Sequence, residues 1–206
     1  NACLTREDGE TLHGIAKGIA ERVNAIRDDW LGFGVLQTSA SRVGAMDVGF
    51  VPNNKGKDTA AILKALNKNE IEILYLIECD ELNLNNTGDA FIIYQGHHGD
   101  KGAAKADVVF PTSAYTEKDS LFVNIEGRPQ FTRKAVQSPG LSKDGWKVFR
   151  ALSDTLKLSL DYNSHEQLLN RIFLEWQHLS KIGEKSKGKW FNNNLKEQIF
   201  ANDYLD

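Results

Sequence analysis

The stretch that decides the fold is FIIYQGHHGDKGAAKADVVFPTSAYTEKDSLFVNIEGRPQ, residues 91–130. It holds two short apolar runs, at 91–94 and 107–110, and the first run leads into a glycine-rich loop. Runs of this length between turn residues predict buried strands, and Pro111, which cannot donate to a strand ladder, ends the second. Helical patterns alternate with such runs along the chain, which predicts βαβ units and a mostly parallel sheet.

The segments on either side extend this alternation. Apolar periodicity, composition and end signals predict helices over 10–27, 39–47 and 59–66, strands over 30–36 and 71–77, and later helices opening at Ser142 and Ser164. The run from Ser164 to Gln167 fits a capping box. We therefore expect an α/β fold, with a Rossmann-like, mostly parallel sheet, helices on both of its faces and a C-terminal helical extension.

The expected organisation has two parts. Residues 1–160 form the α/β domain, and residues 161–206 form the helical extension and a docking tail. The tail from residue 190 onward carries aromatic side chains without the material for a core, so we expect it to dock on a partner. The start, Asn1-Ala2-Cys3, is neither a start methionine nor a signal peptide. This start favours a processed, split or partial polypeptide whose first sheet strand comes from elsewhere.

Composition excludes several classes of function. The chain has 206 residues, 41% of them hydrophobic, and a net charge of -3, so it has no overall attraction to nucleic acid or anionic lipid. No apolar stretch is long enough to span a membrane. Cys3 and Cys79 are far apart and form no CxxC motif, so the chain's own thiolates cannot hold a zinc site or an iron–sulfur cluster. We interpret both as core residues in a reducing compartment.

The glycine-rich loop from Gly96 to Gly102 contains the first candidate site residues. It follows a strand but matches neither phosphate-binding fingerprint, so a tight loop is favoured over a phosphate site. His97 and His98 are adjacent, which makes joint chelation of one metal difficult in an extended chain. Asp100 is the carboxylate that would orient one imidazole, and Glu117 is expected close in space. A metal or acid–base role remains open, and hydrogen bonding that fixes the loop is favoured.

Arg128 lies in a Glu-Gly-Arg turn. Its guanidinium suits a carboxylate or phosphate ligand, and the favoured alternative is an ion pair with Glu117 or Glu126. No nucleophilic triad and no basic stripe with stacking aromatics stands out. We therefore predict no catalytic residue and no metal ligand. The predicted structural polar cluster lies at the C-terminal edge of the sheet, where related folds bind ligands, and consists of His97, His98, Asp100, Glu117 and Arg128.

Residues 95–130 and 139–154 closely resemble the large iron–sulfur (75 kDa) subunit of respiratory complex I, in its C-terminal, molybdopterin-oxidoreductase-like domain. The resemblance covers residues 4–157. The loop at 97–100 and the segment 115–118 are the more specific to the complex I subunit, and the segments 6–9 and 45–49 also match. The positions that fit the wider molybdopterin oxidoreductase pattern are 106–109, Pro111, Glu117, Asn124, Glu126, Gly127, Arg128 and Gln130.

One departure bears on the cofactor. After Glu117 the family commonly has a Gly-Thr pair before an aromatic residue, whereas this chain has Ser120 and Leu121 before Phe122. The change removes a hydroxyl and backbone freedom, which weakens the case for a pterin at this loop. The resemblance thus implies no cofactor in this chain, with the iron–sulfur clusters in the N-terminal part of the subunit.

The resemblance implies a structural or assembly segment of the peripheral arm of NADH:ubiquinone oxidoreductase, without chemistry of its own. The implied partners are other peripheral-arm subunits, including the iron–sulfur portion of the same subunit, with no nucleic acid and no membrane span. The implied location is the matrix side of the mitochondrial inner membrane, or the cytoplasmic side in a bacterium. Two alternatives remain: a cofactor-binding fragment of a molybdopterin oxidoreductase, and a free nucleotide-binding module, which the incomplete glycine fingerprint disfavours.

Overall fold

The computed structural model describes residues 6–28, 30, 32–37, 39–52, 56–79, 82–99 and 101–185. The chain forms two compact units. Unit 1 comprises Asn1–Asp47, Phe122–Gln130 and Lys181–Asp206, and unit 2 comprises Val48–Leu121 and Phe131–Ser180. The chain therefore passes repeatedly between the units. Residue 160, the expected domain boundary, lies within unit 2. The expected docking tail, from residue 190 onward, lies outside the described residues.

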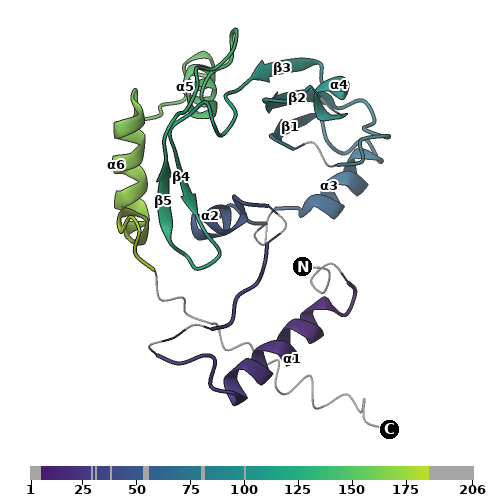
Figure 1. Cartoon of the computed structure of the whole chain (residues 1–206). Helices are drawn as coiled ribbons and strands as arrows, with labels where there is room; N and C mark the ends of the chain where they lie inside the picture. The colour runs from purple at the N-terminus through teal and green to yellow at the C-terminus, as the bar shows by residue number, and fades with distance from the viewer. Residues whose placement is uncertain are drawn as a thin grey trace. The chain divides into compact units, whose positions relative to one another are not determined.

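Unit 2 contains a three-stranded sheet with the strand order β1-β2-β3, and both strand pairs are parallel (Figure 1). The strands are β1 (Ile73–Ile77), β2 (Phe91–Gly96) and β3 (Val108–Pro111). Helix α4 (Lys101–Lys105) connects β2 to β3, which makes a βαβ unit. The predicted parallel sheet is confirmed. A helix, rather than loop alone, follows the glycines after β2.

One face of this sheet carries the core of unit 2. Alternate strand residues point to this face and pack with α3 (Thr59–Leu66) and the loop after β1. Helix α3 begins where the Asp58 carboxylate accepts a hydrogen bond from the Ala61 N–H at 2.7 Å. The buried cluster consists of Leu66, Leu74, Leu76, Leu84, Ile92 and Tyr94.

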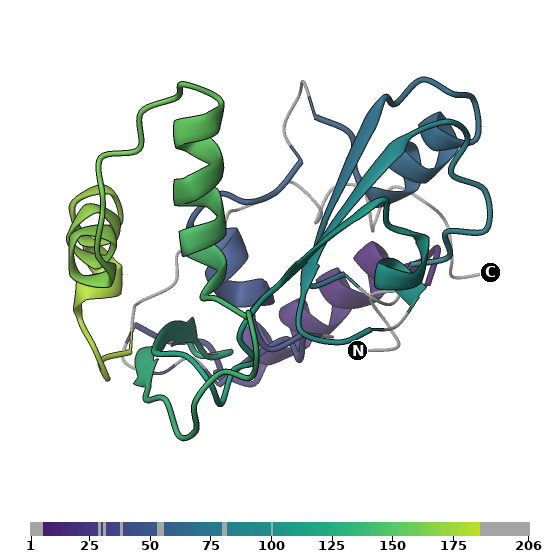
Figure 2. The ribbon, with the colours of Figure 1, turned by 90° about the horizontal axis from the view of Figure 1, so that it is seen from above.

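Helix α5 (Gly145–Thr155) lies on the opposite side of the sheet from α3 and α4 (Figure 2). The rings of Tyr75 and Phe149 stack there with their centroids 5.7 Å apart. Helices on both faces are therefore confirmed. At the other end of this face, Ile73 and Phe91 pair across the strands and remain 62% and 46% exposed.

Helix α6 (His165–Glu175) begins at the predicted N-cap and is followed by the short 3-10 helix η2 (Gln177–Ser180). The Ser164 hydroxyl accepts a hydrogen bond from the Gln167 N–H at 3.2 Å. The Gln167 amide oxygen accepts in turn from the Asn163 N–H at 2.6 Å. The reciprocal pair resembles a capping box displaced by one residue. No helix among the described residues has the length and apolar character needed to cross a membrane.

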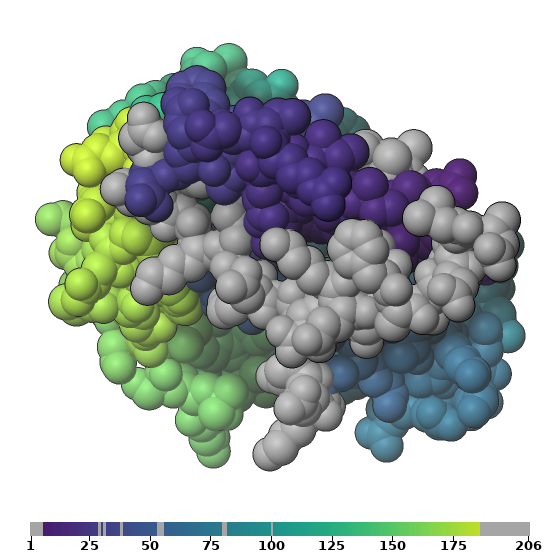
Figure 3. All heavy atoms as spheres, turned by 90° about the horizontal axis from the view of Figure 1, so that it is seen from below, coloured from purple at the N-terminus to yellow at the C-terminus, as the bar shows by residue number. Residues whose placement is uncertain are grey.

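Unit 1 contains helices α1 (Gly9–Arg22) and α2 (Arg42–Asp47). Helix α1 ends earlier than predicted, where the chain turns through Asn24 with a φ of 59°. The side chains of Ile15, Ile19 and Val23 recur at helical spacing and are exposed, and Figure 3 shows atoms of this helix, in purple, at the surface. They form an apolar stripe that the described residues leave uncovered.

Strands β4 (Ser120–Val123) and β5 (Pro129–Thr132) form a two-stranded sheet that the sequence analysis did not predict. The tip of this hairpin, Phe122–Gln130, belongs to unit 1, and its base belongs to unit 2. The chain therefore changes units twice within one short hairpin.

The strand predicted over 30–36 is wrong for the residues that the structure describes there. Residues 30 and 32–37 form no strand, and Trp30 is 53% exposed. The Gly32 N–H instead donates to the Ala25 carbonyl at 2.7 Å, and Arg27 and Trp30 exchange backbone hydrogen bonds. An apolar run becomes a strand only where a neighbouring strand accepts its hydrogen bonds, and here Trp30 and Gly32 bond instead to the residues just before them.

Candidate functional site

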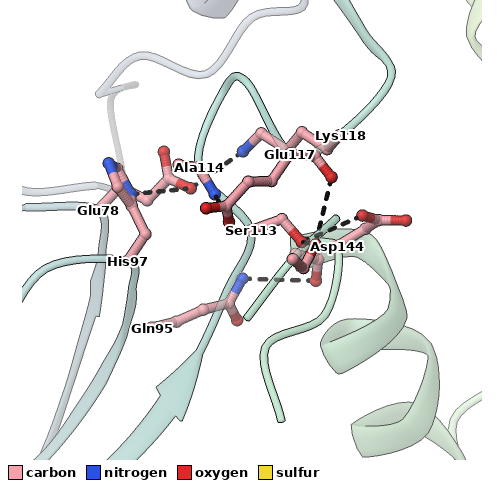
Figure 4. Close-up of polar contacts among 10 residues, drawn as sticks. Glu78, Gln95, His97, Ser113, Ala114, Glu117, Lys118 and Asp144 are labelled. Atoms are coloured by element: carbon pink, nitrogen blue, oxygen red, sulfur yellow. Dashed lines mark hydrogen bonds and ion pairs between the residues drawn. The ribbon is translucent and has the colours of Figure 1, made fainter. Parts of the chain in front are cut away.

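Polar side chains gather in unit 2 where the strands end. Glu78 follows β1, His97 follows β2, and Lys118 lies in the loop after β3. The Glu78 carboxylate accepts a hydrogen bond from Lys118 Nζ at 3.1 Å and lies 4.0 Å from His97 Nδ1 (Figure 4). The C-terminal ends of parallel strands meet at one edge of a sheet, which explains why residues far apart in sequence meet. Glu78 thus connects the loops that follow all three strands.

The two predicted histidines are in contact with each other. The rings of His97 and His98 meet edge to face, with their centroids 4.5 Å apart. Asp100, predicted to orient one of them, lies outside the described residues. In the described part of the chain no three His, Cys, Asp or Glu side chains gather in a metal-binding group. Here the structure shows His97 beside a carboxylate and His98 packed on His97.

Glu117 fixes the turn that precedes it. Its carboxylate accepts a hydrogen bond from the Ala114 N–H at 3.0 Å, and its own N–H donates to the Ala114 carbonyl at 2.9 Å. Its backbone carbonyl accepts from the Ser138 hydroxyl at 3.2 Å. All three contacts join backbone groups to nearby segments, which is the pattern of a residue that holds a loop.

A buried serine connects the loop after β3 to helix α5. Ser113 is fully buried, and its hydroxyl shares a 2.7 Å hydrogen bond with the Ser138 hydroxyl. It also donates to the Asp144 carboxylate at 3.4 Å, at the residue before α5 (Figure 4). Because a buried hydroxyl is costly without partners, these bonds fix the loop against the helix.

A second connection joins the sheet to the same helix. The Tyr75 hydroxyl donates to the Gln95 side-chain oxygen at 2.8 Å, and burial raises the pKa of the Tyr75 hydroxyl. The Gln95 side-chain amide donates to the Gly145 carbonyl at 3.4 Å. Sequence reasoning missed Tyr75, Gln95, Ser113 and Asp144. The sequence signal that could have identified Gln95 and Ser113 is their position just after two of the predicted strands.

Arg128 belongs to unit 1, where it closes the hairpin between β4 and β5. Its guanidinium pairs with the Glu126 carboxylate at 3.2 Å and donates to the Gly183 carbonyl. Lys185 lies 3.3 Å from the same carboxylate. The hydrogen bond from Arg128, followed by that from Lys185, holds the pKa of Glu126 below its usual range. The ion pair with Glu126 is one of the alternatives that the sequence offered for Arg128.

The Asn-Ile-Glu-Gly-Arg motif forms the turn of the same hairpin. The Asn124 side-chain oxygen accepts hydrogen bonds from the N–H groups of Glu126 at 2.9 Å and Arg128 at 3.0 Å. Gly127 has a φ of 75°, a left-handed conformation that favours glycine. The motif therefore builds a tight turn.

Four of the five residues in the predicted cluster are described, and they do not form one group. His97 and His98 contact each other at the sheet edge, Glu117 bonds to Ala114 and Ser138, and Arg128 belongs to unit 1. The contacts of these residues are with other parts of the same chain. Across the described ranges none of these contacts pairs a nucleophile with a general base in the manner of a catalytic triad.

Comparison with known proteins gives the chain a family context. A family model described as Molybdopterin oxidoreductase matches residues 1–155. The chain is 39% identical over 186 residues to the NADH-ubiquinone oxidoreductase 75 kDa subunit of Reclinomonas americana, covering 90% of this chain and 26% of that protein. It is 37% identical over 195 residues to a subunit of the NADH-quinone oxidoreductase of Rickettsia bellii, covering 94% of this chain and 27% of that protein.

A plant protein shows the same relation. NADH dehydrogenase (ubiquinone) iron-sulfur protein 1, mitochondrial, of Solanum tuberosum is 34% identical over 195 residues, which cover 94% of this chain and 25% of that protein. The chain therefore spans about a quarter of the length of the relatives it matches. The resemblance that the sequence motifs indicated is confirmed.

Proposed function

Because this chain belongs to the molybdopterin oxidoreductase family, we propose that it is a structural segment of the peripheral arm of NADH:ubiquinone oxidoreductase. In this role it supports the iron–sulfur electron-transfer portion, which another segment or chain carries. The observation that carries the proposal is its identity of 39% with a 75 kDa subunit over most of its own length. The whole complex oxidises NADH and reduces ubiquinone, and this segment contributes architecture.

The contacts at the sheet edge support a structural role. Glu117 holds a turn, Glu78 joins three loops, and Ser113 fastens a loop to helix α5. Side chains with these duties have their hydrogen-bond partners within the chain, so they do not require a substrate. The same reasoning applies to Arg128, whose guanidinium closes the hairpin.

Uncovered apolar surface supports the dependence on other proteins. The sheet face at Ile73 and Phe91 and the helix stripe at Ile19 and Val23 expose large apolar side chains within their own units. Such surface is unfavourable in water, and covering it is a main driving force of protein association. We propose that other peripheral-arm subunits, including the iron–sulfur portion of the same subunit, provide the cover. The proposed location is the matrix side of the mitochondrial inner membrane, or the cytoplasmic side in a bacterium.

The family name raises the question of a molybdopterin cofactor. A molybdenum centre needs a Cys, Ser or Asp side chain free to coordinate it. Among the described residues Cys79 packs against the core cluster, the Ser113 hydroxyl is buried and bonded, and Asp144 pairs with Lys147 at 2.9 Å. These donors do not fit a molybdenum site. We propose that the segment works without the pterin, and that the clusters lie in the N-terminal part of the subunit.

Arg128→Ala tests the structural role inside the complex. A tagged copy of the chain is expressed in the source cells, the complex is isolated through the tag, and its amount is compared with electron transfer per assembled complex. We expect less assembled complex for Arg128→Ala and unchanged electron transfer in what assembles. Arg133→Ala is the matched control, because Arg133 is exposed and forms no ion pair with any residue that the structure describes.

Three outcomes would contradict the proposal. One is a tagged chain that purifies without NADH dehydrogenase subunits. Another is normal assembly of the Arg128→Ala variant with slowed electron transfer per complex. The third is a stoichiometric amount of molybdenum or tungsten in the purified assembly, which would favour a cofactor-binding fragment instead.

A further inference from the structure

A basic pocket lies in unit 2 beside the network at the sheet edge. Its volume is about 400 Å³, and its walls come from the loop after β3, from the segment 134–147 and from the start of α6. Three separate segments thus meet around one hollow, and all of its walls belong to unit 2. Its lining residues include Ser113, Lys118, Lys134, Lys143, Asp144 and Lys147.

Lysines dominate the charge of this pocket. Four lysines line it against two aspartates, Asp119 and Asp144. Two of the ammonium groups have a carboxylate partner, since Lys118 lies 3.1 Å from Glu78 and Lys147 lies 2.9 Å from Asp144.

The other two lysines have no carboxylate partner among the described residues. Lys134 Nζ donates to the Gln137 side-chain oxygen at 2.7 Å, which leaves its charge uncompensated. Lys143 is exposed, and no described residue accepts a hydrogen bond from its ammonium group. The Asp119 carboxylate accepts a hydrogen bond from the backbone N–H of Lys134 at 2.8 Å. Two ammonium groups therefore remain available to an anion at one pocket.

Helix α5 adds a weaker positive potential at the same place. It has 11 residues and begins at Gly145, next to the pocket residue Asp144. The Asp144 side chain makes no capping hydrogen bond to the helix. The first N–H groups of a helix have no partner within it and carry a partial positive charge. They reinforce the lysines and do not make a site without them.

We propose that this pocket binds the phosphate groups of a small diphosphate-bearing molecule, held chiefly by Lys134 and Lys143. Phosphate oxygens accept hydrogen bonds from ammonium groups and are stabilised by surplus positive charge. A volume of about 400 Å³ falls within the range of small-molecule sites. The His165 imidazole is the one aromatic ring among the described residues that line the pocket, and the four lysines outnumber it, so the walls favour the phosphates over a stacked base. The proposal does not depend on the structural role proposed above.

Hydrogen–deuterium exchange on the purified complex that contains this chain tests the proposal, with inorganic pyrophosphate as the probe. Peptides that cover residues 113–118 and 140–147 are expected to exchange more slowly as pyrophosphate is added, and peptides from α3 are expected to stay unchanged. Lys143→Ala should raise the half-saturating pyrophosphate concentration about tenfold, because one charge-assisted hydrogen bond is lost. Lys143→Arg should retain most of the binding.

Lys105→Ala is the matched control, since Lys105 is an exposed lysine of α4 in the same unit and outside the pocket. It should bind pyrophosphate like the unaltered chain. The proposal is overturned if millimolar pyrophosphate protects neither peptide. It is also overturned if sulfate at equal ionic strength protects them equally, or if both alanine variants weaken binding to the same degree. Repeating the titration with ADP distinguishes a nucleotide ligand, which would bind more tightly, from a free diphosphate.

Discussion

Replacing Leu66 with Ala tests whether the packing of α3 on the sheet sustains unit 2. The Leu66 side chain is fully buried and belongs to the cluster that includes Leu74, Ile92 and Tyr94. It lies at the last residue of α3, so it joins the helix to the sheet face. Its truncation leaves a hole that neighbouring strand residues cannot fill without moving.

The expected loss follows from the carbon atoms removed. Leu→Ala deletes three carbon atoms, which at about 0.8 kcal/mol per buried methylene gives about 2.4 kcal/mol of lost transfer free energy. Partial collapse of the surroundings leaves a residual cavity and an additional cost. We expect the free energy of unfolding of unit 2 to fall by about 3 kcal/mol, within the range observed for buried leucines.

Hydrogen–deuterium exchange of the β1 and β2 amides measures this loss in the assembled or the isolated chain. These amides exchange when the sheet opens, so a loss of about 3 kcal/mol should accelerate them about a hundredfold. Leu174→Ala is the control, because Leu174 is 79% exposed in α6 of the same unit. Its effect should stay within about 0.5 kcal/mol. Acceleration of less than about threefold for Leu66→Ala would show that Leu66 does not hold α3 on the sheet, because truncating a well-packed buried leucine costs far more.

Two further predictions concern a close backbone approach and a surface carboxylate. Gly102→Ala would put a methyl group 2.9 Å from the Tyr94 ring and should destabilise unit 2 by about 1–3 kcal/mol through overpacking. Gly99→Ala is the control, because its methyl group would meet nothing within 4 Å. Equal destabilisation of the two variants in a urea titration would contradict the close approach of Gly102 to Tyr94. Because Arg128 lowers the pKa of Glu126, their ion pair contributes fully above the ordinary titration range of the carboxyl and is lost as the pH falls through the lowered pKa. Arg128→Ala should therefore raise the Glu126 midpoint in an NMR titration, and an unmoved midpoint would argue against the pair.

Elements with local signals were predicted well from the sequence. Helix α3 occupies Thr59–Leu66, as the composition of this segment indicated, and α6 begins after the Ser164 cap. Both depend on contacts within one turn of the chain. The parallel strands were also found, because fully buried strands appear as continuous apolar runs between turn residues.

Elements that need distant partners were predicted poorly. The apolar run at 30–36 has no neighbouring strand among the described residues and forms turns instead, whereas β4 and β5 are short and become strands by pairing with each other. The basic pocket draws its lysines from 118, 134, 143 and 147, and those loops meet only once the sheet and α5 are in place. No window of sequence reveals such a convergence, so the candidate site was only partly predictable.

The interleaving of the two units has a consequence for the order in which they mature during synthesis. The βαβ core of unit 2 is complete once residue 111 has left the ribosome, because its strands follow one another closely. Unit 1 draws on three separated stretches, the last of which starts at Lys181. The early stretch must therefore wait for the late one while the apolar stripe of α1 stays exposed, which makes nascent chains a natural target for chaperones.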